Sequence, residues 1–331
     1  MHLSREALIR IARETAEKRA LSDSGLVAAY LTGSMRTENP FLGNTTDVDI
    51  VFVHDGEPDV HREIIPLTPE IHLDIIHNPR SLYEKPKELR VHPWLGPELY
   101  DSLALYVTRH FFEFIQAGVR DRYHEPANAT LRSQRLVEQA RQVWSKLQAE
   151  RTFGPPQILA YLKSIHLAAN AIALQTGGLL AERRFLLQFP ARAQAAGHPE
   201  LAAALLNLLG ATDLDAAAMT AFLPEWERAF LEAAFIPWVD ARIAAARLGY
   251  YKLACQSMLE SGTPQTGLWP LLLTWTLSVS MLPLPRQERW RSACTTLGLD
   301  EASFSSRMLD LDHFLDVVEA TQENPTAGQG K

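Results

Sequence analysis

The amino-acid sequence predicts an α+β fold, in which an N-terminal mixed sheet with helices precedes an all-α domain. Apolar runs with strand character occur between residues 26 and 76, whereas the periodic stretches from residue 129 onward have helical spacing. A chain of 331 residues is also long enough for two hydrophobic cores. We therefore expect domains at residues 1–126 and 127–321, with a polar, disordered tail at residues 322–331.

The elements expected in the first domain follow from apolar periodicity and from Gly, Pro and Ser signals. The predicted helices cover residues 4–21 and about 97–117, the second because its apolar residues are spaced by three and four. The predicted strands are Leu26–Leu31, the run that ends at Val53, Ile71–Ile76, and a short segment at residues 119–125.

The second domain is expected to contain helices only, as a bundle or an array. Gly and Pro signals such as those at Gly154, Gly177 and Gly262 separate its periodic stretches. The predicted helices are 129–150, 156–176, 182–195, 198–209, 213–234, 237–260, 268–281, 285–297 and 300–320.

The charge of the chain argues against a nonspecific nucleic-acid binder. The net charge is −7 and the pI is about 5.9, whereas such binders normally present a basic face. Residues 130–190 are nevertheless basic, with eight Lys and Arg against three Asp and Glu. This segment has two interpretations, a solvated helix face or a basic wall that faces a bound triphosphate.

The cysteines and the apolar segments indicate a cytoplasmic protein without a membrane partner. Cys255 and Cys294 show no metal-ligand spacing and are expected to be buried thiols in a reducing compartment. The N-terminus reads as an amphipathic helix and has no signal-peptide core. Residues 261–285 contain no charge, but Pro270 and Pro283 interrupt the apolar part, so we expect a buried helix there.

The chemistry of the chain is concentrated in residues 31–53. Asp47 and Asp49 are separated by one residue in a predicted strand, so both side chains point to one face while Val48 points to the other. Adjacent carboxylates repel each other, and a strand keeps such a pair when a cation lies between them. Mg²⁺ fits this role because it binds carboxylates together with substrate phosphates. Asp74 lies in a later apolar strand and joins the pair if the strands are neighbours.

These residues resemble the nucleotidyltransferase superfamily with the polymerase β-like palm. The resemblance is carried by Gly33-Ser34, then Asp47-Val48-Asp49, then Asp74, in that order and with strand and turn context. It implies a nucleotidyltransferase-like mixed sheet, with Asp47, Asp49 and Asp74 as metal-binding and catalytic residues. In the antibiotic-modifying branch the acid at the third position acts as general base, so Asp74 is a metal ligand, a general base or both. The simpler interpretation is a strand-end charge that pairs with an arginine.

The turn before the paired acids is expected to bind phosphate. Gly33 allows close approach of the backbone, and Ser34 offers a hydroxyl and an amide at a predicted helix N-terminus. An ordinary turn with a serine cap is the simpler interpretation. Arg36 either contacts phosphate or holds the loop.

The region Leu159 to Leu206 is similar to the helical domain of aminoglycoside adenylyltransferases of the streptomycin/spectinomycin type. The similarity rests on a Thr-Gly turn at residues 176–177 and on basic and apolar spacing that includes Arg183 and Arg184. It implies that Lys163, Arg183 and Arg184 contact the triphosphate, which suits the bidentate geometry of arginine.

Together these features predict a Mg²⁺-dependent nucleotidyltransferase that moves AMP from ATP, or another nucleoside monophosphate from its triphosphate, to a small hydroxyl-bearing acceptor. The family resemblance suggests an aminoglycoside, because a polycation suits an acidic surface. Two alternatives stay open: an enzyme that acts on RNA or protein, and a non-catalytic nucleotide-binding or toxin-neutralising module.

Overall fold

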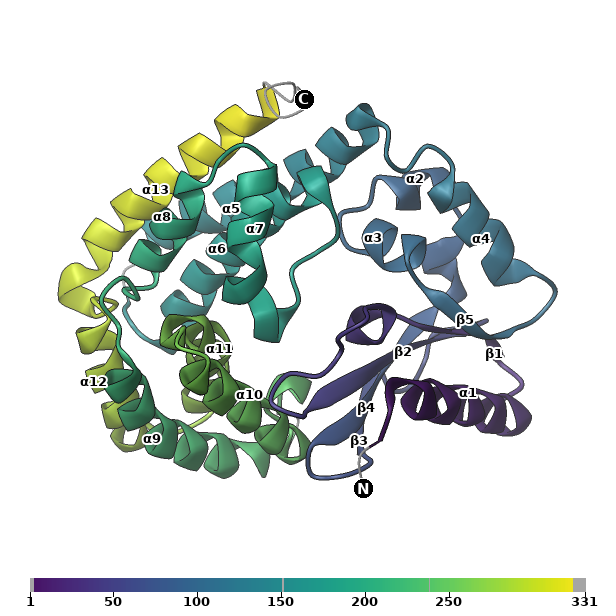
Figure 1. Cartoon of the computed structure of the whole chain (residues 1–331), viewed down its shortest axis with the longest axis horizontal. Helices are drawn as coiled ribbons and strands as arrows, with labels where there is room; N and C mark the ends of the chain where they lie inside the picture. The colour runs from purple at the N-terminus through teal and green to yellow at the C-terminus, as the bar shows by residue number, and fades with distance from the viewer. Residues whose placement is uncertain (1–2, 151, 238, 324–331) are drawn as a thin grey trace. The chain divides into compact units, whose positions relative to one another are not determined.

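The structure is a computed structural model that describes residues 3–150, 152–237 and 239–323. The chain forms two compact units, Met1–Asn128 and Ala129–Lys331 (Figure 1). The first contains a five-stranded mixed sheet with helices and the second is helical, so the predicted α+β fold is confirmed. The predicted disordered tail lies outside the described residues from residue 324 onward, and Gln322 belongs to the last helix.

The first unit builds its sheet from short strands and covers it with helices. The sheet order is β3-β4-β2-β1-β5, in which β2 and β4 are parallel and the other pairs are antiparallel. The elements are α1 (Arg5–Ser22), β1 (Leu26–Leu31), η1 (Gly33–Arg36), β2 (Thr46–His54), β3 (Arg62–Pro66), β4 (Ile71–Pro79), η2 (Arg80–Tyr83), α2 (Pro86–Arg90), α3 (Leu95–Tyr100), β5 (Leu103–Val107) and α4 (Phe111–Arg120).

Strand alternation divides the sheet into two buried faces. Val48 and Ile50 point to the face covered by α1, where they pack with Leu8 and other buried residues of that helix. Val51 and Val53 point to the opposite face and pack into a second cluster with residues of α2, α3 and α4. Asp47 and Asp49 share the parity of Val51, so they lie on this second face, beyond the edge of its apolar cluster.

Two expectations for residues 97–125 were wrong. The predicted helix at 97–117 is instead α3, the edge strand β5 and α4, because β5 pairs antiparallel with β1. Arg109 and His110 have φ angles of 51° and 56°, which break any continuous helix through this segment. The predicted strand at 119–125 is the end of α4 followed by a turn. Leu103 and Tyr106 keep their helix-like spacing of three on one face because a register shift interrupts β5 between them, and apolar spacing alone does not reveal this.

The second unit follows the predicted helix pattern except at 237–260, where the α-helix begins only at Leu248 and two short 3₁₀ turns precede it. Its helices are α5 (Pro126–Ala149), which begins just before the boundary, α6 (Pro155–Thr176), η3 (Glu182–Arg184), α7 (Phe185–Ala195), α8 (Glu200–Leu208), α9 (Ala216–Ala234), η4 (Ala241–Ile243), η5 (Ala245–Arg247), α10 (Leu248–Glu260), η6 (Pro264–Gly267), α11 (Leu268–Ser280), η7 (Leu284–Gln287), α12 (Glu288–Thr296) and α13 (Glu301–Glu323).

The uncharged segment noted in the sequence is the buried centre of this unit. Every residue of α11 from Leu268 to Val279 is buried, and the helix packs against α6, α9 and α10. Its hydroxyls are paired: Thr274 accepts a hydrogen bond from the Trp226 indole at 2.9 Å, and Thr276 accepts one from Trp290 at 3.0 Å. Among the described residues, no helix has the length and apolar character needed to span a bilayer.

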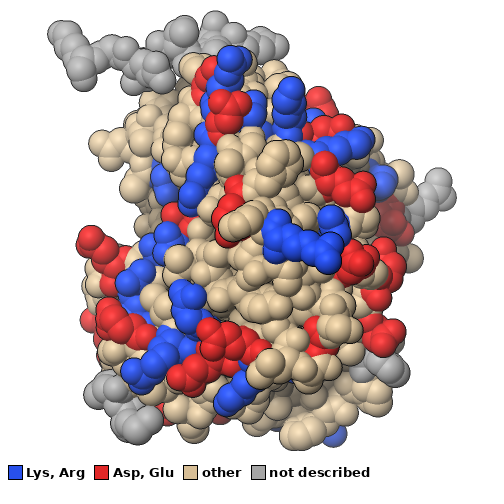
Figure 2. Space-filling view, turned by 90° about the vertical axis from the view of Figure 1, so that its right-hand side faces the viewer, with Lys and Arg blue, Asp and Glu red and all other residues tan. Residues whose placement is uncertain are grey.

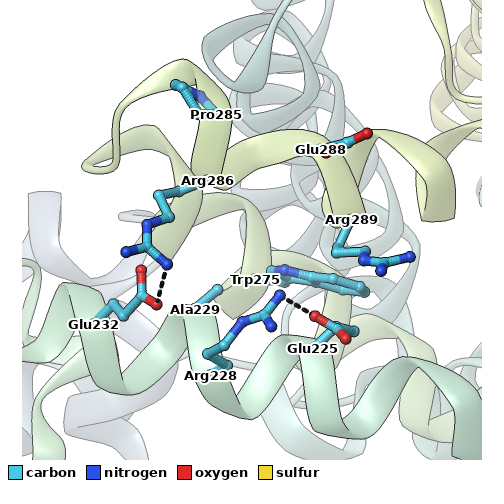
Figure 3. A pocket seen from close by; sticks show the side chains of 9 residues that line it. All are labelled: Glu225, Arg228, Ala229, Glu232, Trp275, Pro285, Arg286, Glu288 and Arg289. Atoms are coloured by element: carbon cyan, nitrogen blue, oxygen red, sulfur yellow. Dashed lines mark hydrogen bonds and ion pairs between the residues drawn. The ribbon is translucent and has the colours of Figure 1, made fainter.

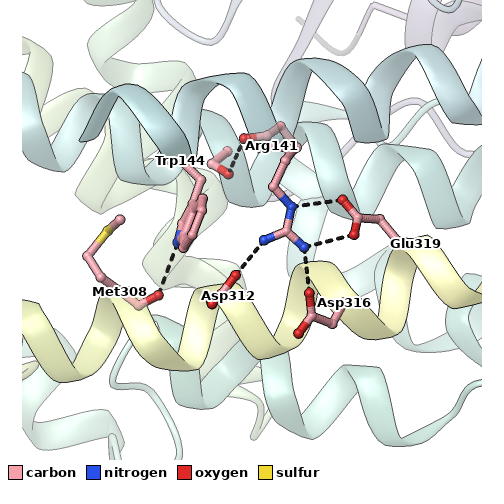
Figure 4. Close-up of polar contacts among 8 residues, drawn as sticks. Arg141, Trp144, Met308, Asp312, Asp316 and Glu319 are labelled. Atoms are coloured by element: carbon pink, nitrogen blue, oxygen red, sulfur yellow. Dashed lines mark hydrogen bonds and ion pairs between the residues drawn. The ribbon is translucent and has the colours of Figure 1, made fainter. Parts of the chain in front are cut away.

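A single arginine joins α5 to α13 within the second unit (Figure 4). The Arg141 guanidinium pairs with Asp316 at 2.7 Å, with Glu319 at 2.8 Å and also with Asp312. The neighbouring Trp144 indole donates to the backbone carbonyl of Met308 at 3.2 Å. Arg141 therefore balances three carboxylates that lie on one face of α13.

Replacement of Arg141 is expected to destabilise the second unit. In Arg141→Gln the three carboxylates on α13 lose their shared counter-charge, and we expect the free energy of unfolding to fall by about 1–2 kcal/mol. The measurement is urea denaturation followed by circular dichroism. The matched control is Arg228→Gln, which removes a single pair with Glu225 and should change stability by less than about 0.5 kcal/mol. Equal losses in the two variants would contradict a special role for Arg141.

Candidate functional site

The pairing of β2 with β4 brings the predicted acids together. In this parallel register Asp49 lies directly opposite Asp74, and Asp47 lies opposite His72. Residues opposite each other in a ladder point to the same face, and so do residues two apart along one strand. All four side chains therefore gather on one face of the sheet. The expectation that Asp74 joins the paired acids is met by this register.

Three of these side chains form a buried group with the spacing of metal ligands. Asp47, His72 and Asp74, which we call the buried triad, offer ligand atoms that all lie within 4.8 Å of one another. Their relative exposures are 7%, 0% and 1%. Burying two carboxylates is costly unless a cation or hydrogen bonds compensate their charge. Two carboxylates and an imidazole are a donor set that fits a divalent metal ion.

Asp49 stands beside the phosphate-binding turn that the sequence predicts. A methyl group placed on Gly33 would lie 1.8 Å from Asp49 Oδ2, so the glycine is required for this close approach. Gly33 also has a φ of +67°, a conformation that L-residues with a side chain rarely adopt. The Thr32 amide donates to the backbone carbonyl of Asp49 at 3.0 Å, which fixes the turn against β2.

The substitution Gly33→Ala should destabilise the fold and displace the Asp49 carboxylate. The left-handed backbone alone costs about 1–2 kcal/mol for a residue with a Cβ, and the overlap with Asp49 adds to this. Urea denaturation measures the loss. Gly56→Ala is the control, because a Cβ there meets no atom within 4 Å and the φ is not left-handed; it should stay within about 0.5 kcal/mol of wild type. Equal stability of Gly33→Ala and wild type would refute this account.

Arg62, on the edge strand β3, forms an ion pair with Asp74. Arg62 donates from Nε to Asp74 Oδ1 at 2.8 Å and from Nη2 to Asp74 Oδ2 at 2.6 Å. This bidentate geometry is the strongest form of ion pair between side chains. Asp74 is 1% exposed and the Arg62 side chain is 34% exposed, so the guanidinium is the nearest compensating charge that also reaches solvent.

Loss of this arginine should cost more than loss of a surface arginine. In Arg62→Gln the Asp74 carboxylate stays buried without its counter-charge, and we expect a fall in unfolding free energy of about 2–3 kcal/mol. Guanidinium chloride titration is the measurement. Arg80→Gln provides the comparison, since Arg80 pairs at 2.9 Å with the exposed Asp55 and its removal should cost about 0.5 kcal/mol. A smaller effect at Arg62 than at Arg80 would mean that water already compensates Asp74.

The remaining residues of the predicted turn are placed as follows. Residues 33–36 form a single 3₁₀ turn, which is too short to present the helix N-terminus that the sequence predicted. The Ser34 hydroxyl lies 3.2 Å from that of Thr46. Arg36 donates to the carbonyl of Asp101 at 2.5 Å and pairs with its carboxylate at 3.6 Å. These contacts favour the loop-holding interpretation of Arg36.

The basic residues predicted to contact a triphosphate occupy different environments in the second unit. Arg183 is 4% exposed; its guanidinium carbon lies 3.4 Å from the Tyr250 ring centroid, and Nη1 donates to the Tyr250 carbonyl. Arg184 is half-buried at the end of η3, and Lys163 is exposed on α6. Packing accounts for the position of Arg183. The triphosphate contact of all three residues stays a prediction.

His166, on the helix that carries Lys163, belongs to an aromatic group. Its ring lies 5.5 Å from that of Phe185 and 5.9 Å from that of Trp269. Burial, together with the charge of Arg242, lowers the pKa of His166 to about 4. The imidazole is therefore neutral at physiological pH and serves as a packed ring.

Two pockets within the units differ in their suitability for a ligand. A pocket of about 140 Å³ in the second unit is lined by Trp275 and by charged residues that pair with each other, such as Arg286 with Glu232 (Figure 3). It is smaller than typical ligand sites, which measure about 300–1,000 Å³. A pocket of about 780 Å³ in the first unit is lined by Asp55, Arg80 and residues of α4. Eight residues of extended chain, about 26 Å, separate Asp55 from Asp47, so this pocket is remote from the acids.

Two residues of the candidate site, His72 and Arg62, were not predicted from the sequence. His72 shares a face with Asp74 by strand alternation, and this signal was available, but a lone histidine is more often structural. Arg62 belongs to β3, which was not predicted because its five residues end in Pro66 and follow a polar loop. Only the pairing of β3 with β4 shows which carboxylate Arg62 meets.

Comparison with known proteins gives little further information. No family model matches the sequence, and no curated protein matches it. Among solved structures, the chain is similar to a nucleotidyltransferase-like protein from Exiguobacterium sibiricum 255-15, with 8% identity and a TM-score of 0.26 over 93% of this chain and 90% of that chain. At this level the likeness assigns neither a family nor an activity. The case for a function is therefore made from the geometry of the site.

Proposed function

We propose that the chain is a metal-dependent nucleotidyltransferase that transfers a nucleoside monophosphate, from ATP in the first instance, to a hydroxyl of a small acceptor with release of pyrophosphate. The observation that carries this proposal is the placement of Asp47, Asp49 and Asp74 on one face of neighbouring parallel strands, beside the Gly33 turn. Such a site has carboxylates for a cation and a glycine that admits a phosphate group.

The residues of the site suit different roles according to how deeply they are buried. Asp47 and Asp74 are buried and suit cation binding, whereas Asp49 is half-buried beside Gly33 and suits contact with the reacting phosphate and its cation. A divalent cation held there, predicted from the sequence as Mg²⁺, would neutralise charge that develops on the phosphate oxygens. Gly33 lets the Asp49 carboxylate lie directly against the turn, and the Ser34 hydroxyl and amide are donors that the turn offers to a phosphate.

We favour cation binding over proton transfer as the role of Asp74. Both of its oxygens accept hydrogen bonds from Arg62, which stabilises the ionised form. A carboxylate has about four lone-pair positions, so two remain available to a metal ion. A group held in this way is well placed as a fixed ligand and poorly placed to collect a proton from an acceptor hydroxyl.

A small acceptor agrees with the charge of the surface better than RNA does. Lys and Arg alternate with Asp and Glu on the described part of the face in Figure 2, rather than forming a continuous basic track. Binding of a single-stranded nucleic acid normally needs a positively charged groove with stacking aromatic residues. The net charge of −7 suits a cationic acceptor, and aminoglycosides are the first compounds to test.

The substitution Asp49→Asn should abolish nucleotidyl transfer with little effect on folding. We expect pyrophosphate release from ATP to fall about 100-fold or more, because the lost carboxylate would hold the cation that neutralises the reacting phosphate. Asp55→Asn is the matched control, an exposed aspartate just beyond the same strand, and it should keep wild-type activity. The assay tests each nucleoside triphosphate with divalent metal, with and without aminoglycosides. Absence of turnover with every nucleotide and acceptor, or full activity of Asp49→Asn, would refute the proposal.

A further inference from the structure

We infer that His72 is a metal ligand and that the buried triad selects a first-row transition-metal cation, with Mn²⁺ as the representative, over Mg²⁺. This inference deepens the proposed function by naming the cation. The sequence pattern of acids predicts an all-oxygen site, whereas the structure places an imidazole in the group from which Asp49 is absent.

The geometry supports a rigid three-donor site. Asp47 and His72 are paired directly across the parallel ladder, and Asp74 is two positions beyond His72 on β4. Each donor therefore comes from a central strand that is hydrogen-bonded on both sides. Donor atoms that all lie within 4.8 Å of one another need only small side-chain adjustments to bind one ion.

The chemistry of the donors argues for a borderline cation. Mg²⁺ prefers oxygen ligands and loses its water reluctantly, so a buried nitrogen donor is a poor ligand for it. Imidazole suits transition metals, carboxylates suit Mn²⁺ as well as Mg²⁺, and divalent affinities rise along the series that begins with Mn²⁺. One imidazole with two carboxylates therefore favours a first-row transition-metal cation over Mg²⁺.

Burial adds to this selectivity. His72 is 0% exposed and Asp74 is 1% exposed, which leaves little room for the several water molecules that Mg²⁺ normally retains. Arg62 already compensates one of the two carboxylate charges of the triad. The type of ligand atom, rather than a large excess of negative charge, is then the main source of the affinity of the triad for the cation.

The test measures metal binding without nucleotide. Mn²⁺ and Mg²⁺ are titrated into the full chain by calorimetry, and Mn²⁺ binding is also followed by electron paramagnetic resonance. We expect wild type to bind Mn²⁺ at least about tenfold more tightly than Mg²⁺, and His72→Gln to lose about tenfold in Mn²⁺ affinity with a smaller change for Mg²⁺. His77→Gln is the control, a buried histidine of the same strand on the opposite face, and should leave both affinities unchanged.

A measurement on the wild-type protein tests the inference even if the His72→Gln variant misfolds. Electron spin-echo modulation of bound Mn²⁺ should show coupling to an imidazole ¹⁴N nucleus, which needs no substitution. Equal affinities for the two metals in wild type, or bound Mn²⁺ without nitrogen coupling, would overturn the inference. Mn²⁺ binding with nitrogen coupling but no pyrophosphate release would sustain the metal site and refute nucleotidyl transfer, so the two proposals fail separately.

Discussion

The parallel register between β2 and β4 is the constraint on which the site depends. Because the side-chain period of a strand is two, a shift of one residue would turn Asp74 and His72 to the α1 face and bury them among Val48 and Ile50. The register is fixed from both faces: Ile50 and Ile75 pack under α1, while Val51 packs with the opposite cluster. Apolar packing along the two strands thus holds close together carboxylates that would otherwise repel each other.

The electrostatic cost of this arrangement is offset locally rather than by the charge of the whole chain. The two carboxylates of the triad are nearly inaccessible to water, and the bidentate contact with Arg62 compensates the charge of Asp74. Asp49, the predicted acid that lies outside the triad, avoids full burial and lies beside Gly33. Each acid therefore has a different environment, although the sequence pattern treats the three alike.

Much of the fold and the placement of the acids followed from the sequence, because both depend on local periodicity. Strand alternation was enough to place Asp47 and Asp49 on one face, and helical spacing was enough for most of the second unit. What could not be predicted depends on contacts between distant segments. The short strand β3 becomes a strand only through its pairing with β4. The segment of β5 was predicted as helix because a register shift in the strand places Leu103 and Tyr106, three residues apart, on one face.

The location of Arg62 has a further consequence. It is carried by β3, the outermost strand of the sheet, which is five residues long and has no fully buried member. Peripheral strands of this kind open more readily than interior ones in native proteins. Transient opening of β3 would move the Arg62 guanidinium away and expose Asp74 to water. The affinity of the acids for a cation is therefore coupled to how stably β3 stays paired with the rest of the sheet.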